Sequence, residues 1–159
     1  MRKTTKKLDL PSIYTAEQYA AYLLSAAMLS AGQIAEKLKK RGYKAEDTAA
    51  VVKKFVELGF LDDAQYAQVY SENLKKYKNF GYYGIKKKLI ERKLSQKQIE
   101  ATLQNFTIAQ ERAIAKRLLE KSAAGKSFEQ KYRMLQTRGF RGEVIAKVVK
   151  RDADAEFSE

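Results

Sequence analysis

Two adjacent carboxylates, Asp62 and Asp63, stand in a chain that is otherwise rich in lysine, and they are the first candidates for catalysis or metal binding. A two-metal nuclease needs carboxylates that converge on one cleft from several segments of the chain. Neighbouring side chains on a helix diverge by about 100°, so this pair does not readily share a ligand. The sequence instead predicts that Asp62 caps a helix and that Asp63 lies in its first turn, where the helix dipole favours a negative charge.

The chain of 159 residues contains no cysteine and no histidine. This composition excludes disulfides, thiolate nucleophiles and cysteine-type zinc sites, together with most hydrolytic triads and transition-metal sites. We therefore expect no catalytic residue, no metal and no cofactor, and a protein that is not an enzyme. The sequence has no run of about 18 apolar residues and no signal peptide after its basic start, which predicts a cytoplasmic protein without a membrane span.

The charge of the chain is strongly unbalanced. Lysine and arginine number 32 against 19 aspartate and glutamate residues, a formal net charge of +13. Such an excess favours partners with acidic or nucleic-acid surfaces. Hydrophobic residues make up 45% of the chain, which is enough for a folded core rather than a disordered polycation.

A repeated capping pattern marks the helix starts. A short polar residue is followed three positions later by glutamine, as in a capping box, at Thr15, Ser30, Asp62, Ser95, Thr107 and Ser127. Three further starts near Ala45, Tyr82 and Gly142 open periodic apolar segments. The single proline, Pro11, and the abundance of good helix formers predict an all-α protein of nine short helices.

The predicted helices fall into three groups of three. The pattern of leucine, two variable residues, arginine and then a turn residue recurs from Leu38, Leu89 and Leu135. We therefore expect an all-α fold of three tandem three-helix, helix-turn-helix-like repeats forming an elongated curved array. The predicted division is a basic N-terminal arm at 1–14, repeats at 15–61, 62–106 and 107–150, and an acidic tail at 151–159.

The central segment, residues 58–103, resembles the second repeat of the RecX family, the regulators of the RecA recombinase. The matching residues are Leu61, Asp62-Asp63, Tyr66-Ala67, Gly81, Ile85 and Leu89. Residues 35–59 are similar to the first repeat and residues 131–149 to the third.

This resemblance implies a regulator that binds the RecA filament on single-stranded DNA. RecX proteins lie along the groove of that filament and modulate, mostly by inhibition, ATP hydrolysis, strand exchange and filament growth in DNA repair, recombination and the SOS response. It also implies no catalytic role for the Asp pair.

The chain departs from the family pattern in two places. Ala26, Ala27 and Met28 occupy the corner after the first predicted helix, where RecX proteins often carry arginine, so a family contact from that corner is not expected here. Lys93 replaces the glycine expected after Arg92, which predicts backbone strain if the turn needs a left-handed residue.

Basic residues are the candidates for partner binding, because five of the eight residues from 86 to 93 are basic. The candidate contacts to the RecA filament or to DNA are Lys86, Lys87, Lys88, Lys93, Lys39, Lys40, Arg133 and Arg141. A lysine-rich face that serves only solubility is an equally good interpretation. Arg41, Arg92 and Arg138 are better explained as structural residues at helix ends, and Tyr82 and Tyr83 as core residues rather than base-stacking ones.

A second function, direct DNA binding by a helix-turn-helix-type regulator, stays open. The second helix of each repeat offers mostly lysine, which holds phosphates but reads base edges poorly. We therefore expect at most weak direct binding to single- or double-stranded DNA, and a monomeric protein.

Overall fold

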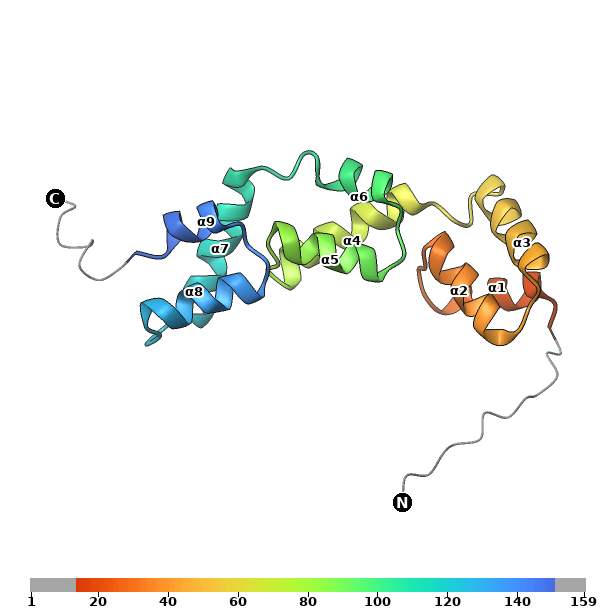
Figure 1. The fold of residues 1–159 in the computed structure, drawn as a ribbon, viewed down its shortest axis with the longest axis horizontal. Coiled ribbons are helices and arrows are strands. Elements are labelled where there is room, and N and C mark those ends of the chain that lie inside the picture. Colours follow the sequence, from red (N-terminus) through yellow and green to blue (C-terminus); the bar gives the residue numbers. More distant parts are fainter. Residues whose placement is uncertain (1–13, 151–159) are drawn as a thin grey trace, which may run out of the picture. The chain divides into compact units, whose positions relative to one another are not determined.

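The computed structural model describes residues 14–150, and this part of the chain forms nine helices and no strand (Figure 1). The helices are α1 (Ala16–Ala26), α2 (Ala31–Arg41), α3 (Ala45–Glu57), α4 (Asp63–Tyr77), α5 (Tyr82–Glu91), α6 (Gln96–Leu103), α7 (Ile108–Ser122), α8 (Phe128–Thr137) and α9 (Gly142–Val148). The prediction of an all-α fold is confirmed. The acidic tail and all of the basic arm except Tyr14 lie outside the described residues.

Each predicted helix start is the start of a helix in the structure. All six predicted capping residues accept a hydrogen bond from the backbone N three residues later, and four of them form the complete reciprocal box: Thr15, Ser30, Thr107 and Ser127. Asp62 and Ser95 make only the first of the two bonds. The three starts without a box fall at Ala45, Tyr82 and Gly142.

The helices α1–α3, here called the first repeat, belong to the unit Met1–Leu61. All three helices contact one another. Their shared core contains Ile34 and Leu38 of α2, Val51 and Phe55 of α3, and Leu61 after α3. The first repeat therefore buries its own apolar faces.

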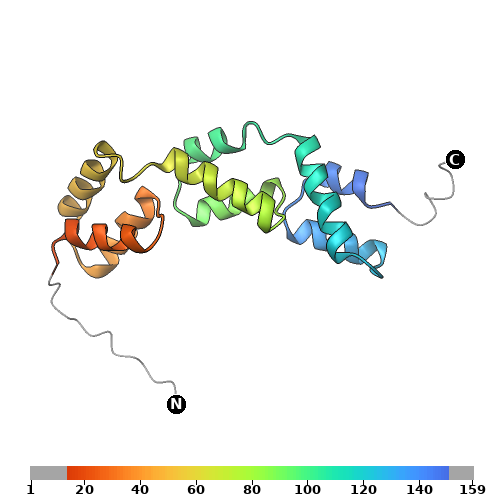
Figure 2. The ribbon, with the colours of Figure 1, turned by 180° about the vertical axis from the view of Figure 1, so that it is seen from behind.

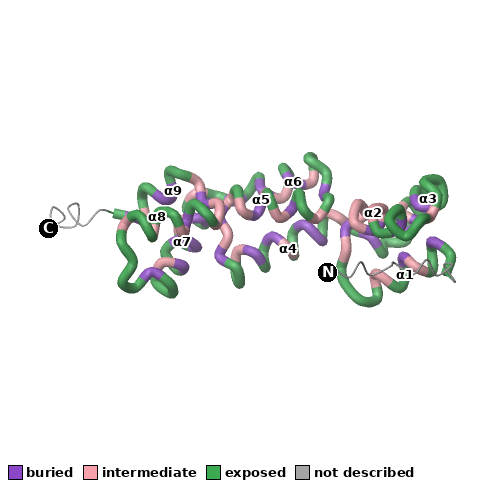
Figure 3. The backbone as a smooth tube through the Cα atoms, turned by 60° about the horizontal axis from the view of Figure 1, so that its bottom comes forward, coloured by how far each residue is buried: buried purple, intermediate pink, exposed green. Residues whose placement is uncertain are grey.

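The helices α4–α6 and α7–α9, here called the second and third repeats, lie together in the unit Asp62–Glu159. One continuous core runs through both repeats and includes Leu74, Ile85, Leu118 and Ile145. Within the third repeat, α9 contacts both α7 and α8 (Figure 2). Buried residues alternate with exposed ones along each helix (Figure 3), as expected for amphipathic helices.

The repeat register is visible in the burial of equivalent residues. Leu38, Leu89 and Leu135 are each 0% exposed, although their sequence neighbours differ in charge and size. Phe55 and Phe106, which share a later position in the repeat, are 4% and 3% exposed. The elongated, curved arrangement of the repeats stays a prediction.

The turn between the second and third helix of each repeat needs a left-handed residue. Gly42 has φ 98° and Gly139 has φ 76°, and Lys93 takes the same role with φ 59°. A side chain in this region costs about 1–2 kcal/mol relative to a right-handed conformation. The turn of the second repeat is therefore strained by its lysine.

Replacing Lys93 with glycine is expected to raise the free energy of unfolding by about 0.5–1 kcal/mol, because the relief of strain exceeds the extra freedom of glycine in the unfolded chain. Urea denaturation followed by circular dichroism measures the change. Gly42→Ala is the matched opposite: no atom lies within 4 Å of the added Cβ, so only the backbone cost acts and stability should fall. A less stable Lys93→Gly protein would show that the lysine makes a contact worth more than the strain.

Candidate binding surface

The Asp62–Asp63 pair begins α4. Asp62 is the N-cap residue, and its Oδ1 accepts a hydrogen bond of 3.0 Å from the backbone N of Gln65. Asp63 is the first residue of the helix. Within residues 14–150, no group of three or more histidine, cysteine or acidic side chains could hold a metal ion.

The lysines of α5 differ in their surroundings. Lys87 is exposed, whereas Lys86 and Lys88 are half-buried. The Nζ of Lys88 lies 3.0 Å from Oε2 of Glu91 and 6.0 Å from the centre of the Phe80 ring. Its hydrogen bond lowers the pKa of Glu91 below the ordinary value. Lys93 is exposed at the turn after α5.

The two predicted lysines of α2, Lys39 and Lys40, are both exposed. The Nζ of Lys40 pairs with Oε1 of Glu36 at 2.6 Å. Lys39 lines a hollow of about 630 Å³ between α2 and α3, together with Lys53 and an apolar wall that includes Val52.

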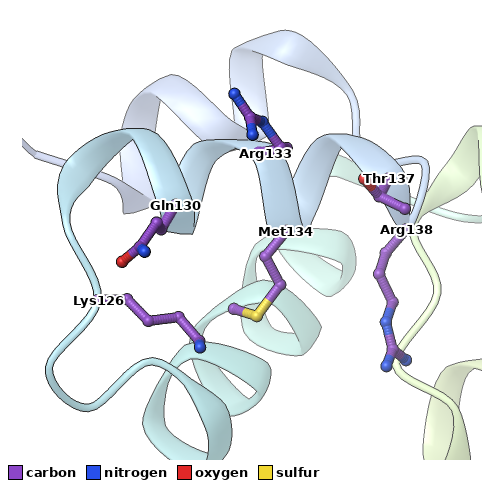
Figure 4. Close-up of a pocket in the computed structure, with 6 residues that line it drawn as sticks. All are labelled: Lys126, Gln130, Arg133, Met134, Thr137 and Arg138. Atoms are coloured by element: carbon purple, nitrogen blue, oxygen red, sulfur yellow. The ribbon is translucent and has the colours of Figure 1, made fainter.

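Arg133 lines a hollow of about 400 Å³ on the third repeat, with Lys126, Met134 and Arg138 (Figure 4). In that view Met134 points into the hollow between Lys126 and Arg138, whereas Arg133 points away from them. Arg133 is exposed. A solvent-facing guanidinium of this kind is free to pair with an anionic surface.

Arg141 has a different role from the other predicted contacts. Its Nε lies 2.5 Å from Oε2 of Glu111, a side chain that is 0% exposed, and its backbone N donates to Oε1 at 2.9 Å. The backbone N of Tyr82 donates to the same Oε1 at 2.9 Å, and the guanidinium lies 4.6 Å from the centre of the Tyr82 ring. These contacts make Arg141 a structural residue between the second and third repeats, so it is not carried into the binding surface.

Glu111 was not among the residues that the sequence singled out. A signal for it exists, because Glu111 stands three residues after Ile108 and three before Ile114, on the stripe of α7 that is otherwise apolar. A charge on such a stripe indicates a buried partner, since an unpaired buried charge is costly. The sequence does not say which arginine provides that partner.

Three glycines, Gly81, Gly84 and Gly139, bring the backbones of the second and third repeats together. The carbonyl oxygen of Gly139 accepts a hydrogen bond of 2.8 Å from the backbone N of Tyr83, and the carbonyl of Arg138 accepts one of 3.0 Å from Gly81. A Cβ on Gly84 would lie 2.3 Å from that carbonyl oxygen of Arg138. Only glycine at position 84 allows this approach.

The three arginines that end the second helix of each repeat cover aromatic rings. The guanidinium carbons of Arg41, Arg92 and Arg138 lie 5.0, 4.7 and 5.7 Å from the ring centres of Tyr19, Tyr70 and Phe80, respectively. Arg138 also donates to the carbonyl oxygen of Lys78. The hydrogen bond with the Tyr70 hydroxyl raises the pKa of Arg92, and burial raises the pKa of Tyr66 beneath it. The positions of the three arginines agree with a structural role, through a ring contact in each case and through a carbonyl bond for Arg138.

These contacts gather several cations around the second repeat. Lys88 and Arg138 both approach the Phe80 ring, and Lys78 and Arg92 stand beside them. On this surface, positively charged side chains lie over the faces of aromatic rings, as in cation–π contacts. Of this group, the sequence singled out only Lys88 as a binding contact, and it favoured a structural role for Arg92 and Arg138.

Comparison with known proteins shows similarity to RecX proteins. Residues 16–55 match a family model described as the first three-helix domain of RecX. The chain is 26% identical over 141 residues to the regulatory protein RecX of Thermobifida fusca (strain YX), covering 84% of this chain and 76% of that protein. It is 30% identical over 141 residues to the regulatory protein RecX of Geobacillus kaustophilus (strain HTA426), covering 84% of this chain. The chain is similar to RecX proteins along most of its length, and its residues 16–55 match the RecX family model.

Solved structures of RecX proteins agree with this chain in fold. A crystal structure of RecX from Lactobacillus salivarius superposes with a TM-score of 0.75 at 20% identity, over 84% of this chain and 92% of that one. A second crystal structure, of a regulatory protein RecX, gives a TM-score of 0.73 at 22% identity, over 84% and 70%. The chain spans 52% of the length of the Geobacillus kaustophilus RecX. Of the helices between residues 14 and 150, none has the length and apolar character needed to cross a membrane.

Proposed function

We propose that this protein is a RecX-family regulator, monomeric, cytoplasmic and not an enzyme. It binds the RecA filament on single-stranded DNA and modulates, mostly by inhibition, ATP hydrolysis, strand exchange and filament growth. The observation that supports the proposal most is the similarity to RecX proteins over 84% of the chain, combined with exposed or half-buried basic side chains on more than one repeat. The proposed contact surface is Lys86, Lys87, Lys88, Lys93, Lys39, Lys40 and Arg133.

The tandem arrangement suits such a partner. A filament presents the same acidic or phosphate-bearing surface again and again, and several modest contacts on one chain multiply their affinities. The lysine and arginine side chains should attract the filament electrostatically. This attraction should raise the association rate, and the affinity should fall as the salt concentration rises.

Co-sedimentation tests the proposal directly. The protein should pellet with RecA filaments on single-stranded DNA and pellet less with the same DNA alone at the same salt. Equal recovery with naked DNA would favour the direct DNA-binding regulator instead. If the protein pellets neither with the filaments nor with naked DNA, both the RecA-binding and the DNA-binding hypotheses are wrong.

Reversing Lys86, Lys87 and Lys88 to glutamate is expected to weaken filament binding roughly tenfold or more, since attraction is lost and repulsion is added at the contact. Thermal stability should change little, because surface substitutions usually cost within about 0.5 kcal/mol each. The largest single part of that cost is the repulsion that Lys88→Glu creates with Glu91 three residues later.

The matched control is reversal of Lys37, Lys39 and Lys40 on α2, beside the corner where this chain departs from the family pattern. It should weaken binding less than the α5 reversal. Equal inhibition of RecA ATP hydrolysis by the wild type and the α5 reversal, near physiological salt, would reduce the α5 lysines to a solvated face.

A further inference from the structure

A hollow of about 560 Å³ opens on the second repeat between α4 and the end of α5. We call it the α4–α5 hollow. Tyr70, Asn73, Leu74 and Tyr77 line it from α4. Their spacing places all four on one face of that helix. The floor is apolar, since Leu74 is 5% exposed and belongs to the core, whereas Tyr77 at the edge is 64% exposed.

Positive charge surrounds this apolar floor. Lys78, Lys88 and Arg92 line the α4–α5 hollow, and none of the described residues that line it is acidic. Glu91, beside the hollow, pairs with Lys88 at 3.0 Å and offsets part of this charge. An exposed aromatic ring next to a buried apolar floor is the usual setting for an anchor side chain of a partner. Three cations around it select a partner segment with negative charge on both sides of that anchor.

The covered rings argue for a peptide over single-stranded nucleic acid. Bases stack on open aromatic faces, but Arg92 already lies over Tyr70, and Lys88 and Arg138 lie near Phe80. Among the aromatic residues lining the α4–α5 hollow, only Tyr77 is mostly exposed, and the Nζ of Lys76 lies over one face of its ring, 5.1 Å from the ring centre. One partly covered ring is too little for a stacked strand, whereas a single large side chain fits a single apolar hollow.

We propose that the α4–α5 hollow binds an acidic peptide segment of a partner protein that carries one aromatic side chain. The aromatic side chain packs against Leu74 and Tyr77, and carboxylates on both sides of it pair with Lys78, Lys88 and Arg92. This proposal names the kind of protein segment that is bound, and it holds whether or not the partner is RecA.

The test uses the full chain and two fluorescein-labelled peptides, Gly-Asp-Glu-Phe-Glu-Asp-Gly and the same peptide with alanine in place of phenylalanine. Fluorescence anisotropy should show binding of the phenylalanine peptide that weakens with salt, and at least about tenfold weaker binding of the alanine peptide. Tyr77→Ser and Lys78→Glu should each weaken the phenylalanine peptide by roughly tenfold.

Matched controls lie away from the hollow. Tyr22→Ser on α1 removes a tyrosine that is 62% exposed, and Lys97→Glu reverses an exposed lysine of α6. Both variants should bind the phenylalanine peptide as the wild type does. Circular dichroism of all four variants separates lost binding from lost fold.

Three outcomes would overturn the proposal. They are no binding of the phenylalanine peptide, equal binding of both peptides, or loss of labelled oligothymidylate binding in Tyr77→Ser with the peptide unaffected. The last outcome would make the hollow a nucleic-acid site. Co-sedimentation of the wild type with RecA filaments is scored separately, because peptide binding without filament binding contradicts the proposed function and leaves the proposal for the α4–α5 hollow intact.

Discussion

Replacing Glu111 with alanine is expected to lower the free energy of unfolding by about 3 kcal/mol or more. The carboxylate is 0% exposed and accepts hydrogen bonds from the backbone N of Tyr82, the backbone N of Arg141 and the Arg141 guanidinium. Alanine leaves two backbone donors and the half-buried Arg141 guanidinium without this acceptor, and removal of one partner of a buried ion pair costs about 3–5 kcal/mol. Urea denaturation measures the loss.

Two further measurements locate the effect of Glu111. Glu111→Gln keeps the shape and one acceptor oxygen but loses the charge, so it should fall between the wild type and the alanine variant. Hydrogen exchange should quicken in residues 62–150 and stay unchanged in residues 14–61, because the two parts have separate cores. A loss below about 1 kcal/mol for Glu111→Ala would mean that water replaces the carboxylate at little cost.

Gly84→Ala is expected to destabilise the protein by about 3 kcal/mol, although alanine normally favours a helix over glycine by about 1 kcal/mol. The added Cβ would meet the carbonyl oxygen of Arg138 at 2.3 Å and Cδ1 of Phe80 at 2.7 Å. A backbone carbonyl cannot turn aside as a flexible side chain does, so the third repeat has to move away from the second. Thermal denaturation gives the size of the effect.

Gly142→Ala is the control for Gly84→Ala. Gly142 is also in the first turn of a helix, α9, and a Cβ added there would have no atom within 4 Å. This substitution should leave stability unchanged or raise it by up to about 1 kcal/mol. If both glycine variants behave alike, the contact between Gly84 and Arg138 does not hold the two repeats together.

Local features of the fold were readable from the sequence, because their signals lie within a few residues. Thr15, Ser30, Thr107 and Ser127 each mark a helix start with a glutamine three positions later, and each forms the reciprocal box. The equivalence of the three leucines follows from spacing alone. Capping and periodicity act within one or two turns, so one sequence is enough to reveal them.

The binding surface was less predictable, because its geometry depends on distant partners. Arg141 and Arg133 look alike in sequence, but Arg141 meets a carboxylate 30 residues away while Arg133 faces solvent. Arg92 and Lys78 border the α4–α5 hollow only because α4 and α5 pack at their ends. The composition of the chain predicts a positive net charge. Packing decides which of the basic side chains pair within the protein and which can contact a partner.

The hydrogen bonds of Glu111 limit where this chain can be divided. Tyr82 is the first residue of α5 and Arg141 is the N-cap of α9, so one carboxylate from the third repeat completes the start of a helix in the second. A fragment that ends between residues 106 and 107 would lose the acceptor for the first turn of α5 and expose the shared core. A cut between residues 61 and 62 keeps both the acceptor for α5 and the shared core of residues 62–150. Repeat swaps or shortened versions of this protein should therefore treat residues 62–150 as a single indivisible module, despite the threefold pattern of its sequence.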